Sequence, residues 1–140
     1  MAKRIILGIV AVFVAWSVLD YVLHQLILGP SYAATAHLWR PMEEMKMGLM
    51  NVVRLLAAIF FTLIYACLVS PKCTGRGVKY GLLFGLGTGV SMGYGTYSVM
   101  AIPYNMALAW FLGSVVEATA GGLLAGLIVK GQAPESTGGQ

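Results

Sequence analysis

Residues 77–93, which read GVKYGLLFGLGTGVSMG, decide how this chain folds. Glycine recurs there at every fourth position, at Gly77, Gly81, Gly85, Gly89 and Gly93. Residues four apart lie on the same face of an α-helix, so these glycines form a row along one face. In lipid, such a row lets a second helix backbone approach closely, because association there depends on van der Waals contact rather than on the hydrophobic effect. The stretch therefore predicts a close helix pair inside a membrane.

The expected partner of this row is the apolar segment that follows the next turn. Small residues repeat there at the same spacing, at Ala109, Gly113, Gly121 and Ala125, and Glu117 falls within the same row. The turn at residues 102–105 is short, so the two helices should be antiparallel neighbours. We expect Gly113 and Gly121 to face the glycine row. The row then has two possible roles: it allows close helix packing, or it provides mobility or an oligomer contact.

The remaining sequence extends this pair to a four-helix transmembrane bundle. Hydrophobic residues make up 59% of the 140 residues and charged residues 10%, whereas soluble domains carry about 25% charged residues. The predicted class is an all-α membrane protein with an antiparallel up-down bundle. Its helices are expected over residues 5–28, 42–69, 78–101 and 105–129, each near the ~20 residues that cross a bilayer. Residues 1–130 form one domain, followed by a flexible tail over 131–140.

Lys and Arg residues indicate the orientation of this bundle. They precede the first span, fill the connection between the second and third, and follow the fourth, at Lys3, Arg4, Lys72, Arg76, Lys79 and Lys130. Cytoplasmic loops carry the excess of such residues, so both termini are predicted to be cytoplasmic. The formal charge of +4 does not indicate a nucleic-acid partner, because the basic residues flank the spans and form no patch.

Three of the predicted spans carry a full charge. Asp20 lies in the first, Arg54 in the second and Glu117 in the fourth. At 1.5 Å per residue they lie roughly 12, 10 and 18 Å below the outer ends of their helices. Charged groups at such depth normally face the protein interior and pair there. We expect the planar guanidinium of Arg54 to bridge both carboxylates, with His24 and Asn51 completing an intramembrane polar network.

Two interpretations of this network remain open from the sequence. In the structural one, Arg54 ties the first, second and fourth helices together, and removing a partner would cost roughly 3–5 kcal/mol. In the functional one, the cluster relays protons or binds an ion or substrate, as intramembrane ionisable residues often do. The residue types allow both.

A weaker metal hypothesis concerns the predicted outer side. Thioether ligands select Cu(I), and Met residues cluster with one His before and at the start of the second span. The candidate copper ligands are His37, Met42, Met45, Met47 and Met50. Met is also an adaptable filler of apolar gaps. We therefore favour a packing role for these residues and expect no bound metal or other cofactor.

Several short motifs resemble those of a known group of proteins. Residues 19–24 (LDYVLH), 37–42 (HLWRPM) and the 81–103 stretch are similar to small bacterial four-span membrane proteins of unassigned function. The resemblance covers most of the chain up to Lys130. It implies a bacterial inner membrane and a four-helix bundle, and it implies no activity and no catalytic residues.

No phosphate-binding loop, nucleophile elbow or zinc-protease helix occurs in the sequence. We therefore expect a non-enzymatic accessory or scaffold subunit that docks on a larger membrane complex, or on its own copies, through apolar helix faces in the lipid bilayer. A small proton- or ion-coupled transporter is the first alternative, and a copper-handling membrane protein is the second.

Overall fold

The computed structural model describes residues 1–130, and over this range the chain is helical with no strand. The expected flexible tail, residues 131–140, lies outside the described residues. Three helical segments are long and apolar enough to cross a membrane: Ala2–Ile27, Met47–Leu68 and Tyr104–Ile128. The prediction of an all-helical chain with membrane-spanning segments is confirmed at this level.

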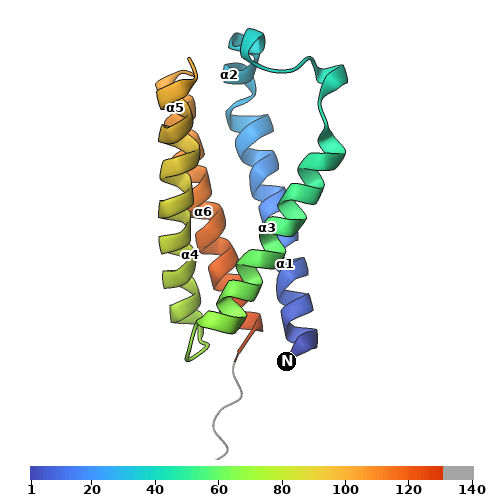
Figure 1. Cartoon of the computed structure of the whole chain (residues 1–140), viewed down its shortest axis with the longest axis vertical. Coiled ribbons are helices and arrows are strands. Elements are labelled where there is room, and N and C mark those ends of the chain that lie inside the picture. Colours follow the sequence, from blue (N-terminus) through green and yellow to red (C-terminus); the bar gives the residue numbers. More distant parts are fainter. Residues whose placement is uncertain (131–140) are drawn as a thin grey trace, which may run out of the picture.

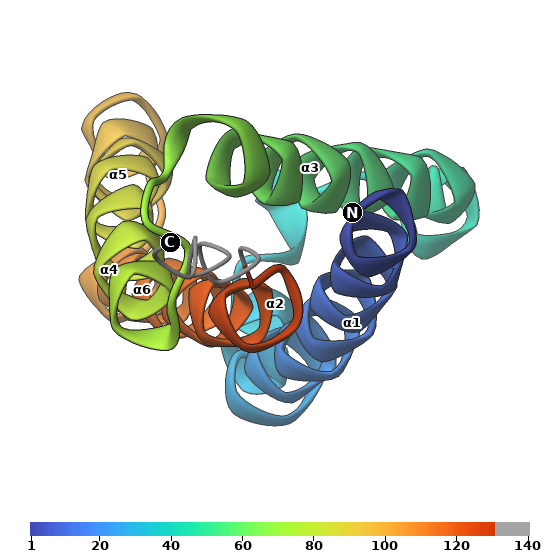
Figure 2. The same cartoon turned by 90° about the horizontal axis from the view of Figure 1, so that it is seen from below.

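In chain order the elements are α1 (Ala2–Tyr21), the π-helix η1 (Val22–Ile27), α2 (Gly29–Ala34), the 3₁₀ turns η2 (Ala36–Leu38) and η3 (Met42–Glu44), α3 (Met47–Leu68), α4 (Thr74–Gly89), the π-helix η4 (Val90–Gly95), α5 (Thr96–Val99) and α6 (Tyr104–Ile128). Short turns join α3 to α4 and α5 to α6, whereas a long connection that includes α2, η2 and η3 leads from η1 to α3 (Figures 1 and 2). We call the end that holds α2, η2 and η3 the loop end. The opposite end, which holds the N-terminus, is the terminal end.

The second long helix begins later than the sequence suggested. Pro41 precedes the single turn η3, and the backbone is then extended at Met45, with φ −68° and ψ 126°. Lys46 is also outside the helical region, with φ −85° and ψ 64°. The helix expected from residue 42 therefore starts at Met47, and the apolar segment alone defines its beginning.

The glycine row lies against α6, and α4 and α6 form the most extensive helix contact in the described chain. A Cβ atom added at Gly77 or Gly81 would overlap the backbone carbonyl of Gly122 or Ala118. A Cβ at Gly85 would lie 2.8 Å from the Ser114 carbonyl oxygen. Such distances are shorter than real side chains allow, so the two backbones touch because these positions are glycine.

The face of α6 that meets the row differs from the expected one. Gly113 and Gly121 face the continuous α1–η1 segment instead, where an added Cβ would meet Leu23 of η1 and Trp16 of α1 respectively. The row on α6 that contacts α4 runs through Ala107, Phe111, Ser114, Ala118, Gly122 and Gly126. α6 therefore carries small residues on two faces, and spacing alone did not distinguish them.

Apolar side chains close the terminal end of the bundle. Phe61 and Tyr65 of α3 are fully buried and stack with Tyr80 of α4 at centroid distances of 4.7 and 5.8 Å. The Tyr80 hydroxyl donates to the Phe61 carbonyl at 2.8 Å. Tyr65 and Tyr80 thus pack α3 and α4 together. In Figure 1, α3 leans away from α4 and α6 toward the loop end.

Candidate functional site

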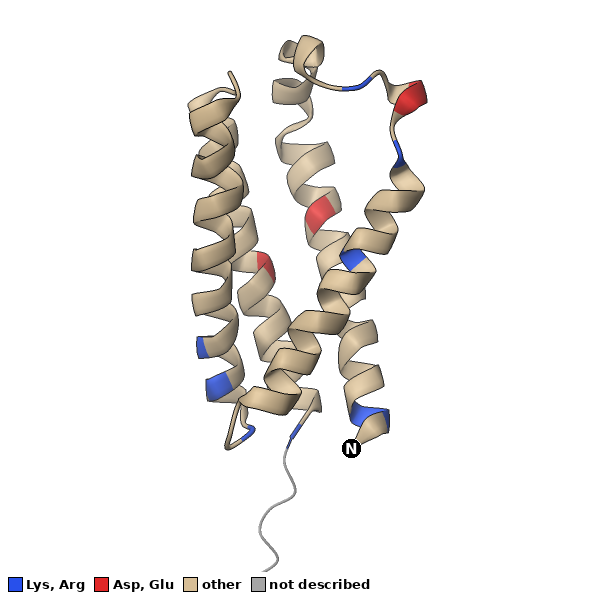
Figure 3. Ribbon diagram, viewed as in Figure 1, with Lys and Arg blue, Asp and Glu red and all other residues tan. Residues whose placement is uncertain are grey.

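The charges of α1 and α3 meet in the middle of the bundle. The Arg54 Nε donates to Asp20 Oδ2 at 2.5 Å, and its Nη1 donates to Asn51 Oδ1 at 3.1 Å. Figure 3 shows these two helices with their mid-bundle charges on facing sides, whereas the other Lys and Arg residues lie near the two ends. The expected pairing of Arg54 with Asp20 and Asn51 is present in the structure.

The expected bridge from Arg54 to Glu117 is absent. Within residues 1–130, the carboxylate that forms an ion pair with Arg54 is Asp20 alone, and Glu117 Oε1 is a buried atom without a hydrogen-bond partner. The physical reason is the tilt of α3, which packs more extensively on α1 than on α6. Arg54 therefore ties two helices together rather than three.

His24 continues the polar network toward the loop end. Its Nε2 lies 3.7 Å from Asp20 Oδ1, and its Nδ1 shares a 2.7 Å hydrogen bond with the Tyr32 hydroxyl. The Trp110 indole N–H also donates to this hydroxyl, at 2.9 Å. Burial in α2, outside the long helices, raises the pKa of Tyr32. A row of polar contacts thus runs from Arg54 through Asp20 and His24 to Tyr32, with hydrogen bonds at its two ends and a 3.7 Å separation between Asp20 and His24.

Sequence reasoning did not identify Tyr32 and Trp110 as members of this network. The two residues meet across 78 positions of sequence. No spacing or motif links two such distant positions. The Trp110 indole meets the Tyr32 hydroxyl only because α6 packs back along the earlier helices.

A cavity of about 90 Å³ adjoins the two acidic residues. We call it the carboxylate cavity, and its lining residues are Asp20, Leu23, His24, Met92, Trp110, Ser114 and Glu117. They come from α1, η1, η4 and α6. One water occupies ~30 Å³ in the liquid, so the cavity has room for a few waters or one small cation.

Both π-helical segments found within residues 1–130 border this cavity. Leu23 and His24 belong to η1, and Met92 belongs to η4. π-Helical turns are rare, and they occur frequently at functional sites because the extra residue per turn redirects side chains. That two such segments, from different helices, border one cavity marks it as the strongest candidate site.

The carboxylate cavity is closed toward the terminal end. One turn below Asp20, the Trp16 indole N–H donates to the backbone carbonyl of Glu117 at 2.6 Å. Trp16 packs in one buried cluster with Val12, Phe61 and Ala118. Aromatic and apolar side chains therefore separate the cavity from the terminal end. Toward the loop end, Trp110 of the lining packs in a second buried cluster with Leu28 and Met106, beside the polar contact of His24 with Tyr32.

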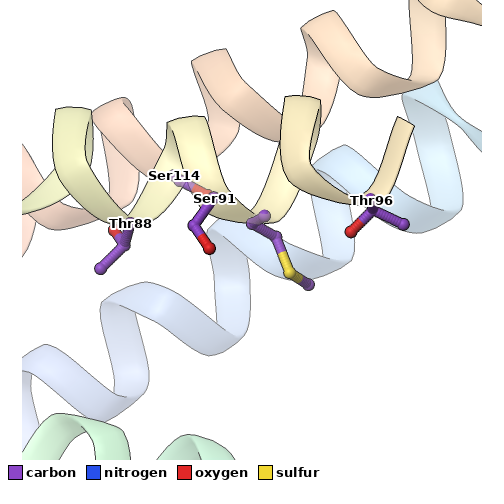
Figure 4. Close-up of a pocket in the computed structure, with 5 residues that line it drawn as sticks. Thr88, Ser91, Thr96 and Ser114 are labelled. Atoms are coloured by element: carbon purple, nitrogen blue, oxygen red, sulfur yellow. The ribbon is translucent and has the colours of Figure 1, made fainter. Parts of the chain in front are cut away.

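A wider hollow of about 480 Å³ lies beside the carboxylate cavity. We call it the hydroxyl hollow, and Thr88, Ser91, Met92, Thr96 and Ser114 line it. Figure 4 shows Thr88, Ser91 and Thr96 projecting from one side of the α4–η4–α5 run, with Ser114 behind them on α6. Met92 and Ser114 line both spaces, so the hollow and the cavity are adjacent.

The candidate copper ligands are spread over separate segments. His37 lies in η2, Met42 in η3, Met45 in the extended connection, and Met47 and Met50 in the first turn of α3. Met42 and Met45 do not share a helical face, because η3 ends at Glu44 and the backbone is extended at Met45. All five side chains are exposed.

The arrangement of the carboxylate cavity restricts its chemistry. Asp20 is neutralised by Arg54, while the free oxygen of Glu117 is removed from solvent without a partner. A buried carboxylate in that position is stable when it holds a proton or a cation. The cavity is therefore suited to binding and releasing one positive charge. No protein-family model, curated protein or solved structure matches this chain.

Proposed function

We propose that the chain forms a four-span bundle in a bacterial inner membrane, with both termini cytoplasmic. Besides the three long apolar helices, the additional crossing is the run Thr74–Val99, in which α4, η4 and α5 follow one another without a break. α4 alone has 16 residues, fewer than the ~20 that cross a bilayer, but the complete run is long enough. The Lys and Arg residues at the terminal end support the cytoplasmic placement of that end (Figure 3).

For the activity, we propose a small proton- or cation-coupled transporter with Asp20, His24 and Glu117 as its coupling site. The observation that carries this proposal is a cavity between helices that is lined by three titratable side chains, one of which has an unpartnered buried carboxyl oxygen. Ionisable groups inside a membrane are costly, and chains of Asp, Glu and His form proton relays in transporters.

The closed terminal end of the cavity favours a transporter over an open proton channel. A polar path connects Asp20 to Tyr32 at the loop end, whereas Trp16 and Phe61 lie on the terminal side. Access from one side at a time is the property that alternating-access transport requires. Buried apolar clusters lie on both sides of the cavity, an arrangement that corresponds to the occluded state of such a cycle.

The test is proton flux in liposomes that contain the purified full-length chain and a trapped pH dye. With K⁺ or methylammonium supplied on the opposite side as the exchanged cation, an imposed pH gradient should dissipate faster than in empty liposomes, and Glu117→Gln should abolish the difference. Glu43→Gln, which removes an exposed carboxylate in the η3 turn, is the matched control and should retain the flux. Equal dissipation by Glu117→Gln and the unchanged chain would contradict the proposal.

A second candidate function, an accessory or scaffold subunit, is supported by the exposure of α3. Of residues 47–57, all except Arg54 are exposed, so this apolar half of the helix has no protein neighbour around most of its surface. Purification from native membranes in a mild detergent, followed by mass spectrometry, should then recover a partner protein in fixed ratio. Replacing Leu49 and Val53 by Ala should release that partner, while replacing exposed Val14 of α1 should not.

A further inference from the structure

We propose that the cation taken by this site is a primary alkylammonium ion, with its nitrogen in the carboxylate cavity and its carbon chain in the hydroxyl hollow. This inference rests on the proposed function and names its substrate class. It is carried by the adjacency of the two spaces, which share Met92 and Ser114. One space is small and acidic, and the other is wider and lined by hydroxyl groups and a thioether.

The charge of the carboxylate cavity selects a monovalent cation. Arg54 lies 2.5 Å from Asp20 and offsets its charge, so an ionised Glu117 leaves the site with one uncompensated negative charge. A divalent cation would leave one uncompensated positive charge instead.

The hydrogen-bonding groups of the cavity select an ammonium that carries protons. A primary ammonium has three N–H donors. The free oxygen of Glu117 and the hydroxyl of Ser114 are acceptors on the cavity lining, and the indole of Trp110 offers an aromatic surface. A quaternary ammonium has no donor and would leave the buried carboxyl oxygen unpartnered. Primary amines should therefore bind better than quaternary ones.

The hydroxyl hollow explains why the cation should carry a carbon chain. Its volume of about 480 Å³ exceeds what a metal ion or ammonium needs, and the hollow is open on the side where Thr88, Ser91 and Met92 are exposed. Met92 supplies an apolar contact at the boundary with the cavity. Ser91 and Thr96 supply hydroxyl groups that suit a polar substituent farther along the chain.

Binding exchanges one cation for one proton. When the alkylammonium enters, the protonated carboxyl of Glu117 releases H⁺ toward the loop end and its carboxylate pairs with the incoming R–NH₃⁺. Charge is conserved in this exchange, and no redox partner is needed. Amine uptake should therefore drive an equal and opposite proton movement and should not depend on the membrane potential.

The binding test uses the full-length chain in detergent and isothermal titration calorimetry with n-butylammonium, tetramethylammonium and n-butanol. We expect saturable binding of n-butylammonium, with the other two at least roughly tenfold weaker. In two buffers of different ionisation enthalpy, the heats should reveal release of one proton per bound amine. Equal binding of n-butanol, or tighter binding of tetramethylammonium, would overturn the inference.

Two substitutions locate the ligand. Glu117→Gln should weaken n-butylammonium binding roughly tenfold or more, and Glu43→Gln should leave it unchanged. Ser91→Leu fills the hollow, so it should weaken n-butylammonium binding while methylammonium still binds as before. Ser91 is exposed on η4, so this variant should fold even if Glu117→Gln does not. Equal loss of both amines in Ser91→Leu would contradict the placement of the carbon chain.

The two proposals fail in different ways. If liposomes show proton flux but the purified chain binds no n-butylammonium, the substrate class is wrong and the coupled transporter stands. If n-butylammonium binds with proton release but liposomes show no flux, the site is a binding site and the transporter is wrong.

Discussion

The two halves of α3 have similar apolar sequences and different surroundings. Residues 58–68, toward the terminal end, include the buried side chains of Ala58, Phe61 and Tyr65. Residues 47–57, toward the loop end, are exposed except for Arg54. Packing holds the first half, while one charged pair joins the second half to α1. Within a single membrane helix, van der Waals contact and charge pairing therefore act on separate segments.

The largest expected effect comes from breaking the charged pair. Arg54→Met leaves Asp20 unpaired in a medium of low dielectric, which should reduce the free energy of unfolding by roughly 3–5 kcal/mol. The double variant Asp20→Leu/Arg54→Met removes both charges and should recover most of that loss. Reversible unfolding in mixed detergent micelles measures both. If Arg54→Met were as stable as the unchanged chain, the ion pair with Asp20 would not be needed to hold residues 47–57 of α3 against α1.

The packed half is tested by two adjacent phenylalanines. Phe61 is 1% exposed and Phe60 is 61% exposed, so they differ in surroundings and not in chemistry. Phe61→Ala should lower the free energy of unfolding by about 3 kcal/mol. The substitution removes the ring contacts with Trp16, Tyr80 and Phe84 and leaves an empty space in the core. Phe60→Ala should change this free energy little. The same unfolding assay measures both variants. Similar decreases in the free energy of unfolding would contradict the distinction between the buried and exposed faces of α3.

The glycine row should matter to the packed half through Tyr80 and Phe84, which it holds against α3. Gly81→Ala places a Cβ against the Ala118 carbonyl, so the helices must separate at a cost of about 1–3 kcal/mol. Gly87 has nothing within 4 Å of an added Cβ. Gly87→Ala should therefore be neutral or slightly stabilising, since Ala is the better helix former. Thermal unfolding followed by tryptophan fluorescence compares the two, and a destabilised Gly87→Ala chain would be the unexpected result.

The smallest effect concerns the loop end of the polar path. Tyr32→Phe removes the hydroxyl that bonds His24 and Trp110, which should cost about 1 kcal/mol at neutral pH.

The pH dependence of this effect follows from the raised pKa of Tyr32. Its neutral form is favoured in the folded state, so the stabilisation is complete below the unfolded pKa of 10.0 and is lost as pH rises through the higher folded pKa. The difference between Tyr32→Phe and the unchanged chain should shrink in strong alkali. Tyr21→Phe, at an exposed position, is the control. A difference that is constant at all pH values would mean that Tyr32 is accessible to solvent.

Much of the helical arrangement was predictable because its signals are local. Hydropathy located the long helices to within a few residues, and the spacing of glycine located the face of α4 that touches α6. The start of α3 was not predictable, since Pro41 and the two glutamates suit the first turn of a short 3₁₀ segment as well as that of a long helix. The sequence likewise identified Asp20, His24, Asn51, Arg54 and Glu117 as candidates, but it did not show which of them touch.

By itself, the amino-acid sequence determined that this chain is helical, where its apolar segments lie, and that charges occur within them. Periodicity and composition carry that information residue by residue. Only the tertiary structure decided that Arg54 pairs with Asp20 and not with Glu117, that Gly113 and Gly121 face the α1–η1 segment, and that Tyr32 meets Trp110. Those outcomes depend on how far α3 tilts from α6, and the tilt of a helix follows from the packing of all its neighbours together.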